Sequence, residues 1–207
     1  MSFEEIGTEN AYKVLAPRPT IIVTTINRKG EVNAAPFSFT MPVSMDPPLI
    51  AFASVASHDT YRNIEEVNEF VVNIPKEDIL DKLWITGEKF PYGVNEIEKA
   101  GFTSKPSKKV SPPGIEECIA CIECKVHWIK NAGDHNVIVG EVLNVSAQEN
   151  SLKDGNLDVE KVKPVLHVGG VNFVVGDHLK RVEWYQTGYE KFIELDHPNY
   201  VRSVLNV

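Results

Sequence analysis

The chain is poor in cysteine, with three among 207 residues, and this odd number disfavours a disulfide framework. Long apolar runs are also missing. The longest, 49–53 and 171–175, have the length of strands and fall far below the roughly 20 residues of a membrane-spanning helix. The acidic first residues lack the basic and then apolar pattern of a signal peptide. We therefore expect a cytoplasmic protein with no membrane partner.

Positive charge and the common nucleotide-binding motifs are lacking as well. The net charge is −8, from 21 basic and 29 acidic residues, which disfavours nucleic acid as a partner. No Gly-x-Gly-x-x-Gly or Walker A loop is present, which argues against a Rossmann or P-loop site, and no Gly-x-Ser-x-Gly elbow is present. A local pocket for one anion remains compatible with this charge.

Most of the chain has the pattern of β-strands. We expect strands at 20–26, 31–34, 49–53, 70–74, 118–130, 136–145, 164–168 and 171–175. Helices are expected at 59–67 and 77–86, with a short one near 95–100 inside an irregular excursion at 89–109. Many strands joined as hairpins, with few helices, favour a mainly β protein, a β-barrel with peripheral helices.

The start of the helix at 59–67 is a candidate anion site. A helix N-terminus presents unpaired N–H groups and a partial positive charge, so it attracts phosphate. Ser57 and Thr60 add hydroxyl donors there, and Arg18 or Arg62 could add a formal charge. Ser57 and Asp59 are plausible N-caps, and Asp59 is assigned to capping because it would repel phosphate. The alternative is a capped helix without a ligand.

Two segments nearby are suited to a planar ring. Small side chains at 33–38 allow a ring to approach the backbone, and the N–H groups of 38–41 could face its polar edge. Pro17 and Pro19 hold Arg18 in extended backbone, where a guanidinium can face an anion. The alternatives are a strand that ends at a proline turn and an ordinary surface arginine.

Cys118, Cys121 and Cys124 form a C-x2-C-x2-C pattern, which raises an iron–sulfur or zinc protein as a competing hypothesis. On a strand, Cys118 and Cys124 would share one face while Cys121 points to the other. We therefore favour buried thiols that act as small hydrophobic residues. Among the scattered histidines, His135, beside Asp134 in the expected hairpin loop 131–135, is the best placed to reach a pocket.

These segments, taken in order over about 10–176, resemble the flavin reductase-like family, whose FMN-binding split barrels include flavoredoxin-like proteins. The matching features are Pro17-Arg18-Pro19, Val23-Thr24-Thr25, Gly30, Asn33, Ala35-Pro36-Phe37-Ser38, Ser44, Pro47-Pro48, Asp59-Thr60, Asn63-Ile64, Glu69 to Asn73, Gly133-Asp134-His135, Gly140-Glu141-Val142, Pro164 and Gly169-Gly170. Each motif is weak alone, but the ordered set is specific. The resemblance implies one domain over 1–207, with a C-terminal extension at 177–207.

The resemblance also implies a six-stranded Greek-key barrel and a homodimer with FMN near the subunit interface. The cofactor-binding residues that it implies are Ser38, Phe39, Thr40 and Met41 along the ring, Ser54, Val55, Ser57, Asp59 and Thr60 around the ribityl chain and phosphate, and Tyr92 in a loop close to the cofactor. By the same resemblance, His58 stands where many relatives carry lysine. Arg18 and Arg62 therefore become the more important candidates for a positively charged partner of the phosphate.

The function expected from these features is flavin-dependent oxidoreduction through bound FMN. No side chain is named as catalytic, because the flavin carries the chemistry in simple hydride or electron transfer. The reductant is expected to be NAD(P)H or a protein electron carrier. The alternative on the same fold is a non-catalytic flavin carrier or electron-transfer protein. A single phosphate site favours FMN over FAD.

Overall fold

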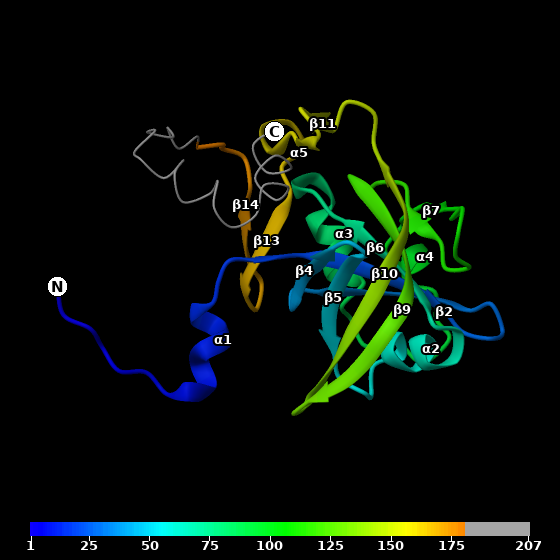
Figure 1. Cartoon of the computed structure of the whole chain (residues 1–207), viewed down its shortest axis with the longest axis horizontal. Coiled ribbons are helices and arrows are strands. Elements are labelled where there is room, and N and C mark those ends of the chain that lie inside the picture. The colour runs from blue at the N-terminus through cyan, green and yellow to red at the C-terminus, as the bar shows by residue number, and fades with distance from the viewer. Residues whose placement is uncertain (181–207) are drawn as a thin grey trace, which may run out of the picture.

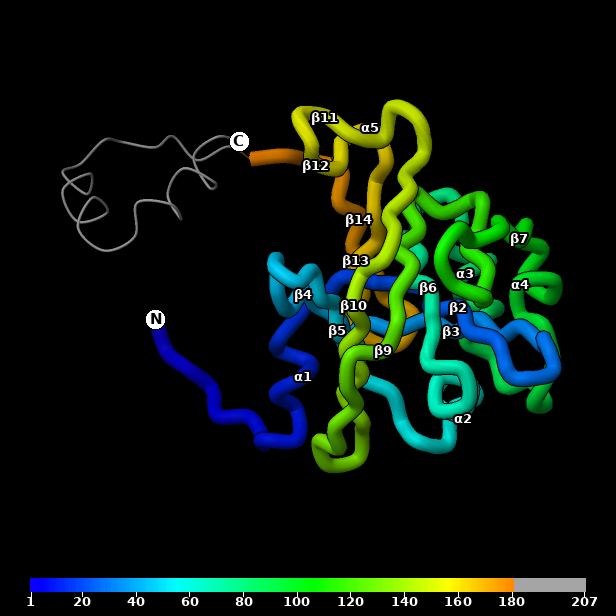
Figure 2. Tube along the Cα trace, turned by 45° about the vertical axis from the view of Figure 1, so that its right-hand side comes forward, coloured from blue at the N-terminus to red at the C-terminus, as the bar shows by residue number. Residues whose placement is uncertain are grey.

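The computed structural model describes residues 1–180 of the chain (Figures 1 and 2). Of the expected C-terminal extension at 177–207, the part from 181 onward lies outside the described residues. Within 1–180, no helix is both long enough and apolar enough to cross a membrane.

One antiparallel sheet of seven strands dominates the fold, in the spatial order β3-β2-β6-β9-β10-β5-β4. In chain order its strands are β2 (Ile21–Ile26), β3 (Val32–Phe37), β4 (Thr40–Met45), β5 (Pro48–Ser54), β6 (Glu69–Ile74), β9 (Ala120–Ala132) and β10 (His135–Ala147). The long strands β9 and β10 run side by side across the molecule (Figure 1). Strand β4 is not predicted from the sequence, and with it the sheet has seven strands where the family resemblance implies six.

The sheet curls around an aromatic core. Phe37 on β3 packs edge-on against Phe52 on β5, with ring centroids 4.9 Å apart, although four strands separate β3 from β5 in the sheet order. Phe52 in turn meets Phe70 on β6, at 5.3 Å. Contact between strands so far apart in the order requires the sheet to close on itself. The mainly β, split-barrel fold expected from the sequence is confirmed.

A second core lies on the other face of β2. Alternate residues of a strand point to opposite faces, so Ile21 and Val23 join the aromatic core while Ile22 faces away from it. Ile22 packs instead with residues of the excursion, among them Ile97 and Phe102. The excursion therefore packs against the sheet and covers one side of it.

The helices agree with the expected ones in position, with one change in type. Helix α2 (Asp59–Val67) has the predicted bounds and ends at Asn68, whose φ of 61° is left-handed. The expected helix at 77–86 is a 3-10 turn, η2 (Glu77–Ile79), followed by α3 (Leu80–Ile85). The short helix of the excursion is α4 (Glu96–Lys99).

A smaller sheet of three strands lies beside the main one, in the order β1-β13-β14. Its strands are β1 (Arg18–Pro19), β13 (Val165–Gly169) and β14 (Asn172–Val175). The remaining elements are η1 (Thr8–Asn10), α1 (Ala11–Val14), β7 (Ser104–Lys105), β8 (Gly114–Ile115), β11 (Leu152–Lys153), β12 (Asn156–Leu157) and α5 (Val159–Val162).

Candidate functional site

A cavity of about 670 Å³ joins the two features that the sequence singles out, the segment 33–39 and the start of α2. Its other walls come from 86–90, after α3, and from the turn between β9 and β10. The lining residues are Asn33, Ala34, Ala35, Pro36, Phe37, Ser38, Phe39, Ala53, Ser57, His58, Asp59, Thr60, Thr86, Gly87, Glu88, Lys89, Phe90, Glu96 and His135. This volume is within the range of about 300–1,000 Å³ that is usual for small-molecule and cofactor sites.

The start of α2 offers unpaired donors to this cavity. The first backbone bond of the helix is donated by Arg62 to the carbonyl of His58, so the N–H groups of Asp59, Thr60 and Tyr61 have no partner within 1–180. The capping role expected of Ser57 and Asp59 is wrong. His58 is the N-cap, and no side chain caps the helix, because Ser57 lies one residue too early and Asp59 is already helical. The donors are thus left for a ligand.

Thr60 is oriented for donation by its neighbour Asn33. The amide of Asn33 donates to the Thr60 hydroxyl oxygen at 2.9 Å, and both side chains are buried. The hydroxyl proton of Thr60 therefore remains available for a bond to an anion or a ligand hydroxyl. Ser57 contributes a second hydroxyl to the same end of the cavity.

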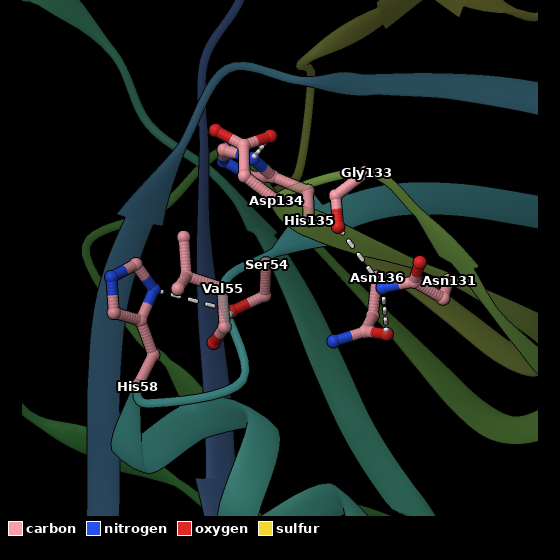
Figure 3. A network of polar contacts seen from close by, with 8 residues as sticks. All are labelled: Ser54, Val55, His58, Asn131, Gly133, Asp134, His135 and Asn136. Carbon is pink, nitrogen blue, oxygen red and sulfur yellow. Dashed lines mark hydrogen bonds and ion pairs between the residues drawn. The ribbon is translucent and has the colours of Figure 1, made fainter.

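His58 and His135 line the cavity between the helix and the β9–β10 turn (Figure 3). The His58 ring contacts the Ser54 hydroxyl at 3.2 Å, and His135 is bonded to Asp134 at 2.8 Å. Partial desolvation lowers the pKa of His58, and His135 adds to the decrease. His58 is therefore largely neutral near about pH 7.

Three carboxyl groups also line the cavity, those of Asp59, Glu88 and Glu96. Asn95 caps α4 by accepting from the N–H of Ile97, and this places Glu96 at the first helical position, where it accepts from the N–H of Ala34 at 2.9 Å. Burial raises the pKa of Glu96, and the charge of Asp59 raises it further. Lys89 brings a positive charge to the same wall.

The rim at 33–39 provides the surface for a ring. Small side chains at Ala34 and Ala35 leave the backbone open, and Phe39 lies tilted against His135 with centroids 5.5 Å apart. The N–H groups of Ser38 and Phe39 have no acceptor within the described chain. The two ends of the cavity thus hold free backbone donors with an apolar shelf between them.

The structure brings together five of the eleven residues expected to contact a cofactor, namely Ser38, Phe39, Ser57, Asp59 and Thr60. The other six do not belong to the wall of the cavity. They are Arg18, Thr40, Met41, Ser54, Val55 and Tyr92. His135, expected to reach a pocket, lies in the wall, at the first position of β10 rather than in the loop.

Arg18 and Tyr92 are each held by contacts elsewhere in the fold. Arg18 donates to the carbonyl oxygens of Tyr12 and Leu15, which close the end of α1. Tyr92 donates to Asn63 at 3.0 Å, and the guanidinium of Arg62 covers its ring at 4.4 Å. Neither arginine that the sequence offers as a phosphate partner therefore lies in the wall of the cavity.

The sequence reasoning did not identify Glu96, Glu88 or Lys89. Asn95 could have pointed to Glu96, because an asparagine is a common N-cap and fixes where α4 begins. The contact of Glu96 with Ala34, however, depends on how the excursion packs on the sheet. Glu88 and Lys89 follow α3 and belong to no sequence motif that indicates a binding site.

The cysteines lie away from the cavity. All three are buried and free, and burial raises the pKa of Cys124 to about 12. Metal ligation needs the thiolate form, which such burial disfavours. No group of three or more potential metal ligands occurs within residues 1–180.

Comparison with known proteins gives the family. The flavin reductase like domain matches residues 14–171, so the chain belongs to that family. An uncharacterized protein of Aquifex aeolicus is 37% identical over 182 residues, which cover 83% of this chain and 92% of that protein.

Two solved structures share the fold. Nitrilotriacetate monooxygenase component B of Bacillus cereus matches with a TM-score of 0.76 at 28% identity, over 89% of this chain and 98% of that one. The 2-nitrobenzoate 2-nitroreductase NbaA of Pseudomonas fluorescens matches with a TM-score of 0.77 at 28% identity, over 87% and 93% of the two chains.

Proposed function

We propose that the cavity binds FMN, with the phosphate at the start of α2 and the isoalloxazine ring along the rim. The observation that carries the proposal is one cavity with free backbone donors at both ends, at 59–61 and at 38–39. The first set suits a phosphate, and the second suits the polar edge of a flavin ring. The proposed direct contacts are Ser38, Phe39, Ser57, Asp59 and Thr60.

The charges in the wall support a cofactor with one phosphate. The α2 N-terminus is a single anion-binding end, while the carboxyl groups of Glu88 and Glu96 in the wall disfavour a second phosphate group. We therefore propose FMN rather than FAD.

We further propose that the protein is a flavin-dependent oxidoreductase that takes electrons from NAD(P)H. Bound FMN would supply the hydride and single-electron chemistry, and the chain would bind the ring, orient it and tune its reduction potential. Family membership supports this class of activity, as does the likeness to proteins named as a monooxygenase component and a nitroreductase.

The test uses the purified full chain. We expect a yellow protein with flavin absorption bands that releases FMN on denaturation and oxidises NADH or NADPH with free FMN as acceptor. Tight FMN binding without oxidation of either nucleotide would favour the alternative, an electron-transfer protein or flavin carrier. A colourless protein that takes up no added FMN would overturn the proposal.

We also propose that the protein is a homodimer with the cofactor near the interface. Strand β4 supports this, because it lies at an edge of the sheet and exposes Met41, Val43 and Met45, which are 59%, 42% and 79% accessible. An exposed apolar edge strand is avoided in monomers, since it invites pairing. On this proposal Met41 reaches the cofactor region through the partner subunit rather than within its own chain.

A further inference from the structure

A phosphate at the start of α2 would meet little positive charge in the wall of the cavity. Three carboxyl groups line it, those of Asp59, Glu88 and Glu96, against the single lysine Lys89. A phosphate monoester carries about −1.5 to −2 charges near about pH 7, so its entry adds to an excess of negative charge. A group in the wall that can take up a proton would therefore favour the bound state.

His58 meets this condition by its position. It is the N-cap of α2, so it directly precedes the free N–H groups of 59–61, and its ring lies in the cavity wall. Its Nδ1 lies 3.2 Å from the Ser54 hydroxyl (Figure 3). Its Nε2 points away from Ser54 and makes no hydrogen bond within residues 1–180. One ring nitrogen is thus held by the chain, and the other is left for a ligand.

The charged neighbours of His58 come from several elements. Burial and then His135 on β10 lower the pKa of His58, while Asp59, the next residue of α2, raises it. His135 is in turn bonded to Asp134 at 2.8 Å, and the neighbours of His58 on β3 and β5 carry no charge. The other charged groups of the cavity wall are Glu88, Lys89 and Glu96. An anion beside Nε2 would reverse this balance, because a close opposite charge favours the protonated ring.

We propose that His58 selects the phosphorylated form of the flavin by taking up a proton from solvent as the phosphate binds. The protonated ring then donates from Nε2 to a phosphate oxygen. This inference rests on the proposed function and adds to it the residue that supplies positive charge at the phosphate end. It follows that the contribution of His58 to FMN affinity increases as the pH falls, whereas His58 contributes nothing to the affinity for riboflavin, which has no phosphate.

The test is calorimetric titration of the flavin-free full chain with FMN and with riboflavin, at about pH 7.5, in two buffers of different ionisation enthalpy. The change in observed enthalpy between the buffers gives the number of protons taken up on binding. We expect uptake that approaches about one proton per FMN, and none with riboflavin. The phosphate is mostly ionised at this pH, so it does not itself account for uptake.

Two variants of His58 separate its charge from its shape. His58→Gln is polar but cannot take up a proton, so it should abolish the uptake. Wild type should bind FMN about 10-fold more tightly than His58→Gln at about pH 6, as for one charge-assisted hydrogen bond, and equally by about pH 9. His58→Lys carries its charge already and should restore tight FMN binding at about pH 8 without proton uptake. All three proteins should bind riboflavin equally.

The matched control is His127→Gln, at an exposed position of β9 outside the cavity wall. It should leave proton uptake and both affinities unchanged. Proton uptake that persists in His58→Gln, or an equal loss of FMN and riboflavin binding in that variant, would overturn the inference. FMN binding without proton uptake refutes this inference alone, whereas failure to bind either flavin refutes the proposed function and this inference with it.

Discussion

Thr60 shows how a single side chain is prepared for a ligand. Asn33 donates to its oxygen at 2.9 Å, which directs the hydroxyl proton elsewhere, and the N–H of the same residue is one of the three free donors of α2. From the sequence alone, a hydroxyl such as that of Thr60 at the start of a helix predicts an anion site only in general terms. The contact with Asn33, 27 positions away, requires β3 and α2 to be packed together.

We predict that Thr60→Ala weakens FMN binding by about 10- to 100-fold, since a hydrogen bond to a charged group contributes about 1.5–3 kcal/mol. The measurement is the quenching of FMN fluorescence on titration. Thr60→Ser, which keeps the hydroxyl, is the control and should bind almost as wild type does. Unchanged affinity in the alanine variant would remove Thr60 from the site.

Glu96 gives a pH-dependent prediction. Its pKa is raised by burial and by Asp59, so it takes up a proton at a higher pH than an ordinary glutamate. Glu96→Gln keeps an acceptor for the N–H of Ala34 and removes the charge near the phosphate. FMN should bind about threefold tighter to this variant at about pH 8, and the difference in affinity should fade as the pH falls through the raised pKa of Glu96.

The control for Glu96 is Glu98→Gln, on the exposed side of the same helix α4. Its effect on FMN affinity should be negligible at either pH. A Glu96→Gln variant that matches wild type at about pH 8 would show that this carboxyl group does not face the phosphate.

At the scale of elements, sequence patterns predict where strands and helices lie better than how they end. Helix α2 has its predicted bounds, but its cap is His58 without a side-chain bond, because Ser57 falls one residue early. Strand β4 is missed because Pro42 interrupts it, and proline is excluded from central strands. Both edge strands of the sheet contain a proline, Pro36 in β3 and Pro42 in β4, where no neighbour needs the missing N–H.

A buried carboxylate on the sheet, that of Glu123, holds the end of the excursion at 89–109. Glu123 on β9 is 1% exposed and accepts from the N–H groups of Lys108 and Lys109 and from Asn144. Burial acts to raise the pKa of Glu123, but these hydrogen bonds outweigh it and hold the pKa below its ordinary value. The ionised form therefore stabilises the fold.

We predict that Glu123→Gln lowers the free energy of unfolding by about 1–3 kcal/mol near about pH 7, because an amide NH₂ then faces backbone donors. A lowered pKa in the folded state gives stability that is present above about 4.3, the ordinary glutamate value, and is lost as the pH falls through the lowered value. Urea unfolding as a function of pH measures this.

Glu149→Gln, at an exposed position, is the control for Glu123 and should leave stability unchanged at each pH. If the free energies of unfolding of Glu123→Gln and wild type differ by the same amount down to about pH 3, Glu123 is not ionised in the folded protein.

At the scale of the whole molecule, the sequence predicts the closed β architecture and the meeting of the rim with the α2 tip. It does not predict the charges of the wall. Arg18 is held by the carbonyl groups of Tyr12 and Leu15, and Arg62 by the ring of Tyr92, and these contacts form only in the complete fold. The two arginines that the sequence suggests as phosphate partners thus make contacts outside the cavity wall.

The exposed edge strand β4 leads to a prediction about assembly. We expect the full chain to be a dimer at micromolar concentration in analytical ultracentrifugation, because Met41 and Met45 would otherwise expose an apolar edge. Met45→Lys should weaken the dimer, and Lys153→Glu, on the exposed strand β11, is the control. A monomer that still binds FMN would show that the site is complete within one chain.

On the proposed binding mode, the α2 tip and the rim at 33–39 hold opposite ends of one cofactor. Comparing the affinities of FMN and riboflavin by calorimetry tests it most directly, since the two differ only in the phosphate. We expect FMN to bind at least about 10-fold more tightly than riboflavin, and Thr60→Ala to reduce this preference. Equal affinities for the two flavins, or no binding of either, would contradict it.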